Sequence, residues 1–179
     1  MKKITFLLFI SVIYGSFAQE RLMTNTGIIT FEASIPFFEE VKGTHDKVIC
    51  ILEPKTSKLS CVVIIKGFQF KRQLMKTHFN ENYIESDKHS KATFKGKIEK
   101  FDLKNIHEEA LEYLIKGKIE IHGVTKNIAV KAKIKKVADG LEFTSDFNLN
   151  TDDFKIEIPF IVSNKISKNV NTQLKFVLQ

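Results

Sequence analysis

Apolar and polar residues alternate along most of this chain, as is typical of strands with one buried face. The pattern is clearest at residues 110–121, where Leu111, Tyr113 and Ile115 share one parity and Glu112 and Lys116 the other. Asp139-Gly140 is a strong signal for a tight turn between two such segments. Alternation and apolar β-branched runs predict strands at 29–33, 48–52, 61–65, 92–101, 110–121, 128–134, 141–149 and 170–178.

A hairpin is predicted around residues 53–58, where Pro, Lys, Thr and Ser separate two β-branched runs. Centred on that turn, Cys50 falls opposite Cys61 on the neighbouring strand. The pair is compatible with a cross-strand disulfide in an oxidising compartment. It is equally compatible with two buried thiols that pack as small hydrophobic groups.

One segment departs from the strand pattern. Met75, Phe79 and Tyr83 are four residues apart, and Leu74 and His78 flank them on the same face of a helix. A single aromatic helix in an all-β chain must bury its apolar stripe against the strands. We therefore expect it to form a lid or plug at the open end of a barrel.

The predicted fold is all-β: an eight-stranded antiparallel barrel with one short helical insert. Closure removes the exposed edges of a sheet, and about eight strands leave room for side chains or one small ligand. The chain has 179 residues and no low-complexity tract or Pro/Gly linker. We expect one domain, at residues 19–179.

The first 18 residues have the features of a secretory signal peptide. Lys2 and Lys3 precede a short apolar run, and Ser16-Phe17-Ala18 supplies small residues for cleavage after Ala18. An uncleaved anchor is the weaker alternative, because a bilayer span needs roughly 20 apolar residues. The mature chain has no other long apolar run, so we expect a periplasmic or secreted protein without an integral membrane segment.

Composition adds two features. The chain has 16 phenylalanines and no tryptophan, so its aromatic groups suit either a packed core or a dry apolar lumen. The formal net charge is +7, with lysines spread along the strands. A solvated outer face explains them, and attraction to anionic lipid head groups or a phosphate is the alternative. No nucleic-acid-binding motif is present, so no nucleic acid partner is expected.

Catalytic and metal-binding motifs are not evident in the sequence. None of the five histidines has metal-ligand spacing with a carboxylate partner, and the chain has no Cys-x-x-Cys, nucleophile elbow or phosphate-binding glycine loop. We therefore expect no enzyme activity, no metal and no cofactor. His78 differs from the other histidines because it lies on the apolar face of the predicted helix.

Three segments resemble the YceI-like family of exported lipid-binding barrels. They are LMKTHFNENYIES with KATFKG at 74–86 and 91–96, GKIEIHGVTK at 117–126, and the stretch from Phe147 to Pro159. The resemblance covers essentially the whole mature chain. It implies a lipocalin-like barrel that holds a long-chain isoprenoid, a quinone or a fatty-acyl ligand in its lumen, and it allows a homodimer.

On this basis the expected function is to sequester or carry such a lipid without covalent chemistry. Met75, His78, Phe79 and Tyr83 would gate the lumen. The lining would include Phe31, Phe94, Tyr113, Ile119, Phe143, Phe147 and Phe176. Three alternatives stay open: a lumen filled by its own phenylalanines, a scaffold or stress protein, and a small lipid-modifying enzyme that uses His78.

Overall fold

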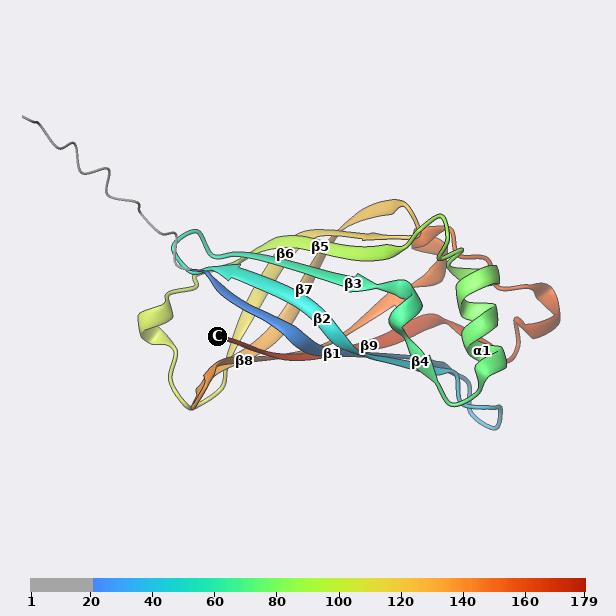
Figure 1. Ribbon diagram of the computed structural model, residues 1–179, viewed down its shortest axis with the longest axis horizontal. Coiled ribbons are helices and arrows are strands. Elements are labelled where there is room, and N and C mark those ends of the chain that lie inside the picture. The colour runs from blue at the N-terminus through green and yellow to red at the C-terminus, as the bar shows by residue number, and fades with distance from the viewer. Residues whose placement is uncertain (1–20) are drawn as a thin grey trace, which may run out of the picture.

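A computed structural model describes residues 21–179, so the predicted signal peptide at 1–18 lies outside the described residues. The described chain forms a closed antiparallel barrel, drawn in Figure 1. Eight long strands follow one another around it in the order β1-β2-β3-β5-β6-β7-β8-β9, and β9 returns to β1. The eight-stranded antiparallel barrel predicted from alternation is confirmed.

Six of the eight long strands are longer than the alternating segments that predicted them, whereas β5 and β6 are slightly shorter than the predicted 92–101 and 110–121. Their bounds are β1 Leu22–Ser34, β2 Lys42–Glu53, β3 Lys58–Ile64, β4 Gln69–Phe70, β5 Lys91–Ile98, β6 Leu111–Ile121, β7 Val124–Val137, β8 Gly140–Asn150 and β9 Ile166–Leu178. The two-residue β4 pairs with the start of β2.

The helical elements are short. The insert consists of α1 (Gln73–His78) followed by a π-helical turn, η2 (Phe79–Tyr83). We call residues 73–83 the lid. Single turns of 3-10 helix occur at η1 (Ile65–Gly67), η3 (Leu103–Asn105), η4 (Thr151–Phe154) and η5 (Phe160–Val162). Within residues 21–179, no helix is long and apolar enough to cross a membrane.

The two ends of the barrel differ. At one end, on the left in Figure 1, the segment around η3 covers the strands. Leu52, Ile98, Ile134 and Leu178 are fully buried there. The lid lies at the other end, where β5 begins and β6 meets β7. The packed end supplies a rigid base, and the end with the lid is free to hold a ligand.

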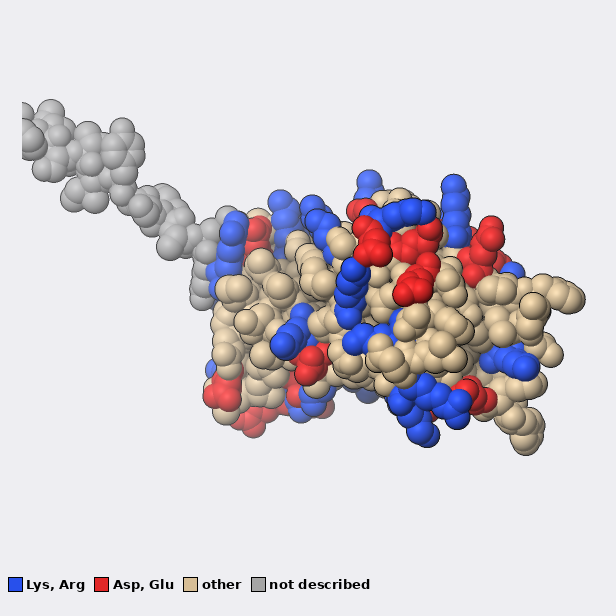
Figure 2. Space-filling view, turned by 45° about the vertical axis from the view of Figure 1, so that its right-hand side comes forward, with Lys and Arg blue, Asp and Glu red and all other residues tan. Residues whose placement is uncertain are grey.

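The outer face of the barrel carries the charged residues that alternate with the apolar ones along the strands. Lys95, Lys97, Lys131 and Lys133 are exposed. Some surface lysines pair with carboxylates on neighbouring strands, as Lys131 does with Glu112 at 2.8 Å and Lys175 with Glu142 at 3.1 Å. On the face shown in Figure 2, basic and acidic side chains are interspersed. This distribution fits the solvated outer face expected from the sequence.

The β2–β3 hairpin has the predicted register. Cys50 lies directly opposite Cys61, and the structure joins their Sγ atoms in a disulfide. Cys50 is fully buried and Cys61 is 8% exposed, so the bond lies on the inner face of the barrel wall. It links strands that the hairpin already places side by side.

We expect loss of this disulfide to destabilise the protein without changing its fold. A loop with a sequence separation of 11 predicts a loss of about 3 kcal/mol in the free energy of unfolding, because the unfolded chain gains freedom. The measurement is urea unfolding of the oxidised protein and of a Cys50→Ala/Cys61→Ala variant. Equal stabilities, or free thiols in the oxidised protein, would contradict the bond.

Candidate ligand-binding cavity

The half of the barrel next to the lid encloses a cavity of about 480 Å³. Its walls come from all eight long strands, since inward-facing positions of each strand line it. The lining is almost wholly aliphatic and aromatic, with Val48, Val63, Ile115, Val130 and Leu174 between the rings. The lumen is therefore not filled by its own phenylalanines, contrary to one of the alternatives left open by the sequence.

All but one of the predicted lining and gating residues border this cavity. They are Phe31, Met75, His78, Phe79, Tyr83, Phe94, Ile119, Phe143, Phe147 and Phe176. Phe143 and Phe176 form the floor, where their rings stack with centroids 4.8 Å apart. Both side chains are buried and belong to the hydrophobic core.

Tyr113 does not border the cavity. It has the inward parity of β6, but it lies near the packed end of that strand, where its ring contacts Phe101 at a centroid distance of 6.0 Å. Parity predicts which face of a strand a residue occupies and gives no information on depth along the barrel. This explains why the sequence pattern placed Tyr113 with the lining residues.

Aromatic side chains hold the lid against the barrel. Phe79 stacks on Phe31 of β1 at 5.2 Å and contacts Phe68 at 5.5 Å and Phe70 at 5.0 Å. These four rings, Phe31, Phe68, Phe70 and Phe79, form what we call the phenylalanine cluster. The sequence analysis missed Phe68 and Phe70, although their alternation across Gln69 was the available signal.

The lid itself has little intrinsic stability. The helix α1 has six residues and its N-cap, Arg72, makes no side-chain capping bond. Isolated helices this short are unstable in water, so packing of the lid on the phenylalanine cluster must supply its order. The π-helical turn that follows is a geometry often found at functional sites. Tyr83 at its end is half-buried, and burial raises the pKa of its phenol.

His78 lies at the mouth of the cavity. The predicted apolar face of the helix does contain it, but its side chain is exposed, whereas Met75, Phe79 and Tyr83 are half-buried. Its position suits contact with the polar end of a ligand better than a buried structural role.

The open end of the cavity, its mouth, combines exposed apolar side chains on loops with a few charged side chains. Phe37 on the β1–β2 loop and Phe160 and Ile161 on η5 are almost fully exposed. These loops project at the right-hand end of Figure 1. Arg72, which directly precedes the lid, pairs with Glu39 at 2.6 Å, and both residues border the cavity. Lys165 adds an exposed cation to the same rim.

One polar atom inside the mouth lacks a partner in the described structure. Thr151, at the start of η4, borders the cavity, and its Oγ1 is buried without a hydrogen bond. A buried hydroxyl without a partner costs about 1–3 kcal/mol. A ligand oxygen near this position would remove that cost.

His45 supports the wall behind the phenylalanine cluster. It is 5% exposed and its ring contacts Phe68 edge-on, with centroids 5.4 Å apart. The backbone N–H of Lys47 donates to its Nδ1 at 2.9 Å, so the neutral ring carries its proton on Nε2. Burial, outweighing the nearby Asp46 carboxylate, lowers the pKa of His45 below its ordinary value of 6.5.

This geometry defines a class of protein: a closed antiparallel barrel with an apolar internal cavity and a helical lid. The sequence model of the YceI-like domain matches residues 21–178, nearly the whole described chain. The chain therefore belongs to the YceI-like family.

Solved structures share this fold at low sequence identity. A polyisoprenoid-binding domain from Saccharophagus degradans has a TM-score of 0.77 at 13% identity, covering 89% of this chain and 97% of its own. Burkholderia cenocepacia BcnA has a TM-score of 0.68 at 11% identity, covering 86% and 96%. The Campylobacter jejuni YCEI protein has a TM-score of 0.54 at 19% identity, covering 99% and 98%. No curated protein shows significant similarity to the chain.

The lowered pKa of His45 predicts a pH dependence of stability. In the unfolded chain this histidine takes up a proton near pH 6.5, whereas in the folded protein it does so only at lower pH. The stabilisation of the fold that comes from a neutral His45 is therefore complete above pH 6.5 and is lost as the pH falls below that value. We expect the free energy of unfolding to fall from pH 7.5 to 5.5 more steeply in the wild type than in His45→Gln. Urea unfolding at each pH measures this, with His107→Gln as the exposed control. Parallel curves for wild type and His45→Gln would contradict the expectation.

Proposed function

We propose that this protein binds a long-chain apolar lipid in the barrel cavity and carries or sequesters it without covalent chemistry. The observation that carries the proposal is the cavity of about 480 Å³, lined almost only by apolar side chains and covered by the lid. Preformed concave apolar sites of 300–1,000 Å³ are typical of small-molecule binding. A scaffold protein would have no need of such a cavity.

The volume limits the ligand. At about 30 Å³ for a group the size of a water molecule, the cavity has room for roughly 16 methylene-sized groups. That capacity suits a single fatty-acyl chain or a short isoprenoid. A longer isoprenoid or quinone tail would have to displace the lid or extend through the mouth.

Burial alone supplies enough free energy for such a ligand. Each buried CH₂ contributes about 0.8 kcal/mol, so a chain of about 16 carbons contributes roughly 13 kcal/mol before the cost of association. That cost is about 4–15 kcal/mol, and a preformed cavity keeps it low. Affinity is therefore expected to depend mainly on how much of the cavity the chain fills.

The mouth favours a ligand with one polar end. His78 and Lys165 offer donors at the rim, and Thr151 Oγ1 offers an unused hydroxyl just inside it. A carboxylate, phosphate, alcohol or quinone oxygen there would meet these groups while the chain occupies the lumen. The exposed Phe37 and Phe160 extend the apolar surface outward from the same opening.

The comparisons support the binding class. One structural neighbour is a polyisoprenoid-binding domain, and this chain shares its barrel at a TM-score of 0.77. We further propose that residues 1–18 direct export and that residues 19–179 form the mature periplasmic or secreted protein. A cleaved leader agrees with a disulfide between Cys50 and Cys61, because such bonds persist in oxidising compartments.

Native mass spectrometry of protein exported by a bacterial host tests the proposal. We expect a protein that begins at Gln19 with one co-purified lipid, identified after organic extraction. In Val130→Phe, the larger side chain enters the cavity, and the bound lipid should be reduced at least about fivefold, since overfilling costs roughly 1–3 kcal/mol.

Ala129→Phe is the matched control. Ala129 is the neighbouring residue of β7 and is exposed on the outer face, so the same substitution there should leave the bound lipid unchanged. Protein without any lipid, and without uptake of added fatty acid or farnesol, would favour the scaffold alternative. Chemical conversion of the lipid that His78→Ala abolishes would favour an enzyme.

Chain length gives a second prediction. For saturated fatty acids added to delipidated protein, affinity should rise about fourfold for each CH₂ and level off near 16 carbons, when the cavity is full. Displacement of a fluorescent fatty acid measures the series. A flat series would show that the chain does not enter the cavity.

A further inference from the structure

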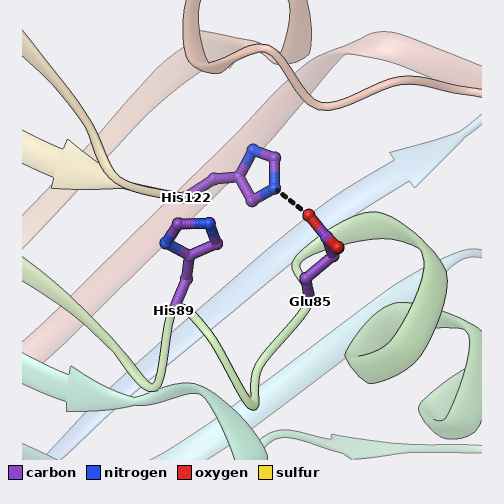
Figure 3. Close-up of side chains that lie close together, drawn as sticks. All are labelled: Glu85, His89 and His122. Atoms are coloured by element: carbon purple, nitrogen blue, oxygen red, sulfur yellow. Dashed lines mark hydrogen bonds and ion pairs between the residues drawn. The ribbon is translucent and has the colours of Figure 1, made fainter.

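Three potential metal ligands meet beside the lid, outside the cavity. Glu85 and His89 follow the lid in sequence, and His122 lies in the turn between β6 and β7. One ligand atom from each, a carboxylate oxygen or an imidazole nitrogen, lies within 4.8 Å of the others. Figure 3 shows the three side chains converging from these two segments.

We propose that Glu85, His89 and His122 form a site for a divalent transition metal ion such as zinc, and that the ion fastens the end of the lid segment to the β6–β7 turn. Two imidazoles and one carboxylate are a ligand set that zinc uses in proteins. Three protein ligands leave a fourth position for water.

The orientation of His122 is fixed in the way that metal-binding histidines require. Its Nδ1 lies 3.0 Å from the carbonyl oxygen of Phe154, which can only accept a hydrogen bond. The Nδ1 atom therefore carries the proton, and Nε2 of the neutral ring presents a lone pair. A hydrogen bond from the second ring nitrogen to a backbone carbonyl is the usual support of a metal-ligating histidine.

The lone pair of His122 Nε2 faces an oxygen of the Glu85 carboxylate. His122 Nε2 lies 3.4 Å from Glu85 Oε2, so a neutral imidazole and a carboxylate would present lone pairs to one another unless a cation lies between them. For metal–ligand bonds of about 2.1 Å, the edge of a tetrahedral site is about 3.4 Å. The observed separation already matches one edge, and a ring nitrogen of His89 lies within 4.8 Å of both ligand atoms.

The backbone places these residues in unusual conformations. Glu85 (φ 47°) and His122 (φ 52°) both occupy the left-handed region, which is rare for residues other than glycine. The His89 backbone N–H donates to the Glu85 carbonyl at 2.9 Å, so both side chains project from one compact turn. Gly123 (φ 71°) is needed beside them because a Cβ there would lie 2.8 Å from the His89 ring.

A proton is the competing occupant. Lys88 pairs with Glu85 Oε1, which leaves Oε2 for His122 or for a metal. A protonated His122 would complete a Lys88–Glu85–His122 ion-pair network without any ion. The side chain of His122 is 13% exposed and that of Glu85 is 38% exposed, so a metal ion can still enter from solvent.

Zinc titration of delipidated protein, prepared without a polyhistidine tag, tests the site. Competition with a chromophoric zinc chelator should show one ion per chain. Glu85→Gln and His89→Gln should each weaken binding by at least about tenfold. His107→Gln, the same substitution at an exposed histidine near the packed end, should have no effect.

Two further measurements, NMR of His122 and thermal unfolding, distinguish a bound metal ion from a Glu85–His122 ion pair. Zinc should shift the ¹⁵N resonance of His122 Nε2 while Nδ1 keeps its proton, and it should raise the Tm of the wild type but not of His89→Gln. Zinc-free Tm values of the variants close to that of the wild type would show that they fold. No uptake at ~100 μM zinc, or uptake that both variants leave unchanged, would overturn the site.

The fastening role rests on the proposed lipid binding and has a separate readout. With zinc bound, release of a preloaded fluorescent fatty acid should be slower in the wild type and unchanged in His89→Gln. Zinc binding without an effect on release would overturn the fastening role alone. Failure of lipid binding would leave the zinc titration as an independent result.

Discussion

The closure of the sheet through β1 is the constraint on which the rest of the structure depends. This strand pairs with β2 on one side and β9 on the other, so every long strand has two neighbours and the barrel has a defined interior. The β1–β2 register shifts on both sides of Gly27, where a Cβ would lie 3.0 Å from the Val48 carbonyl oxygen. The irregularity bends β1 around the barrel. Gly27 therefore allows β1 and β2 to approach closely at this bend.

A closed barrel of this size must distribute its side chains unevenly to leave space. Large aliphatic residues and the segment around Phe101 and Ile106 fill the packed end, and the stacked pair Phe143–Phe176 ends the solid core. Beyond this pair, rings such as Phe94 and Phe147 border the cavity. The same residue type thus fills the core at one depth and lines a cavity at another.

Periodicity explains how much of this the sequence could predict. A period of two predicts the inner and outer faces of each strand, so the barrel, the Cys50–Cys61 register and most lining residues were accessible from the pattern alone. Depth along the barrel was not, as Tyr113 shows. Contacts across long separations were not accessible either. Glu85 and His122 are 37 residues apart, and no local spacing signals their meeting.

The lid is too short to be stable alone, so its order depends on contacts with the barrel. The phenylalanine cluster holds the lid over the cavity through apolar contacts, which a lipid chain in the lumen would extend. Directly after the lid, Glu85 approaches His122 at 3.4 Å, in a contact between polar groups. The phenylalanine cluster and the Glu85–His122 pair therefore place neighbouring parts of one weak element through different chemistry.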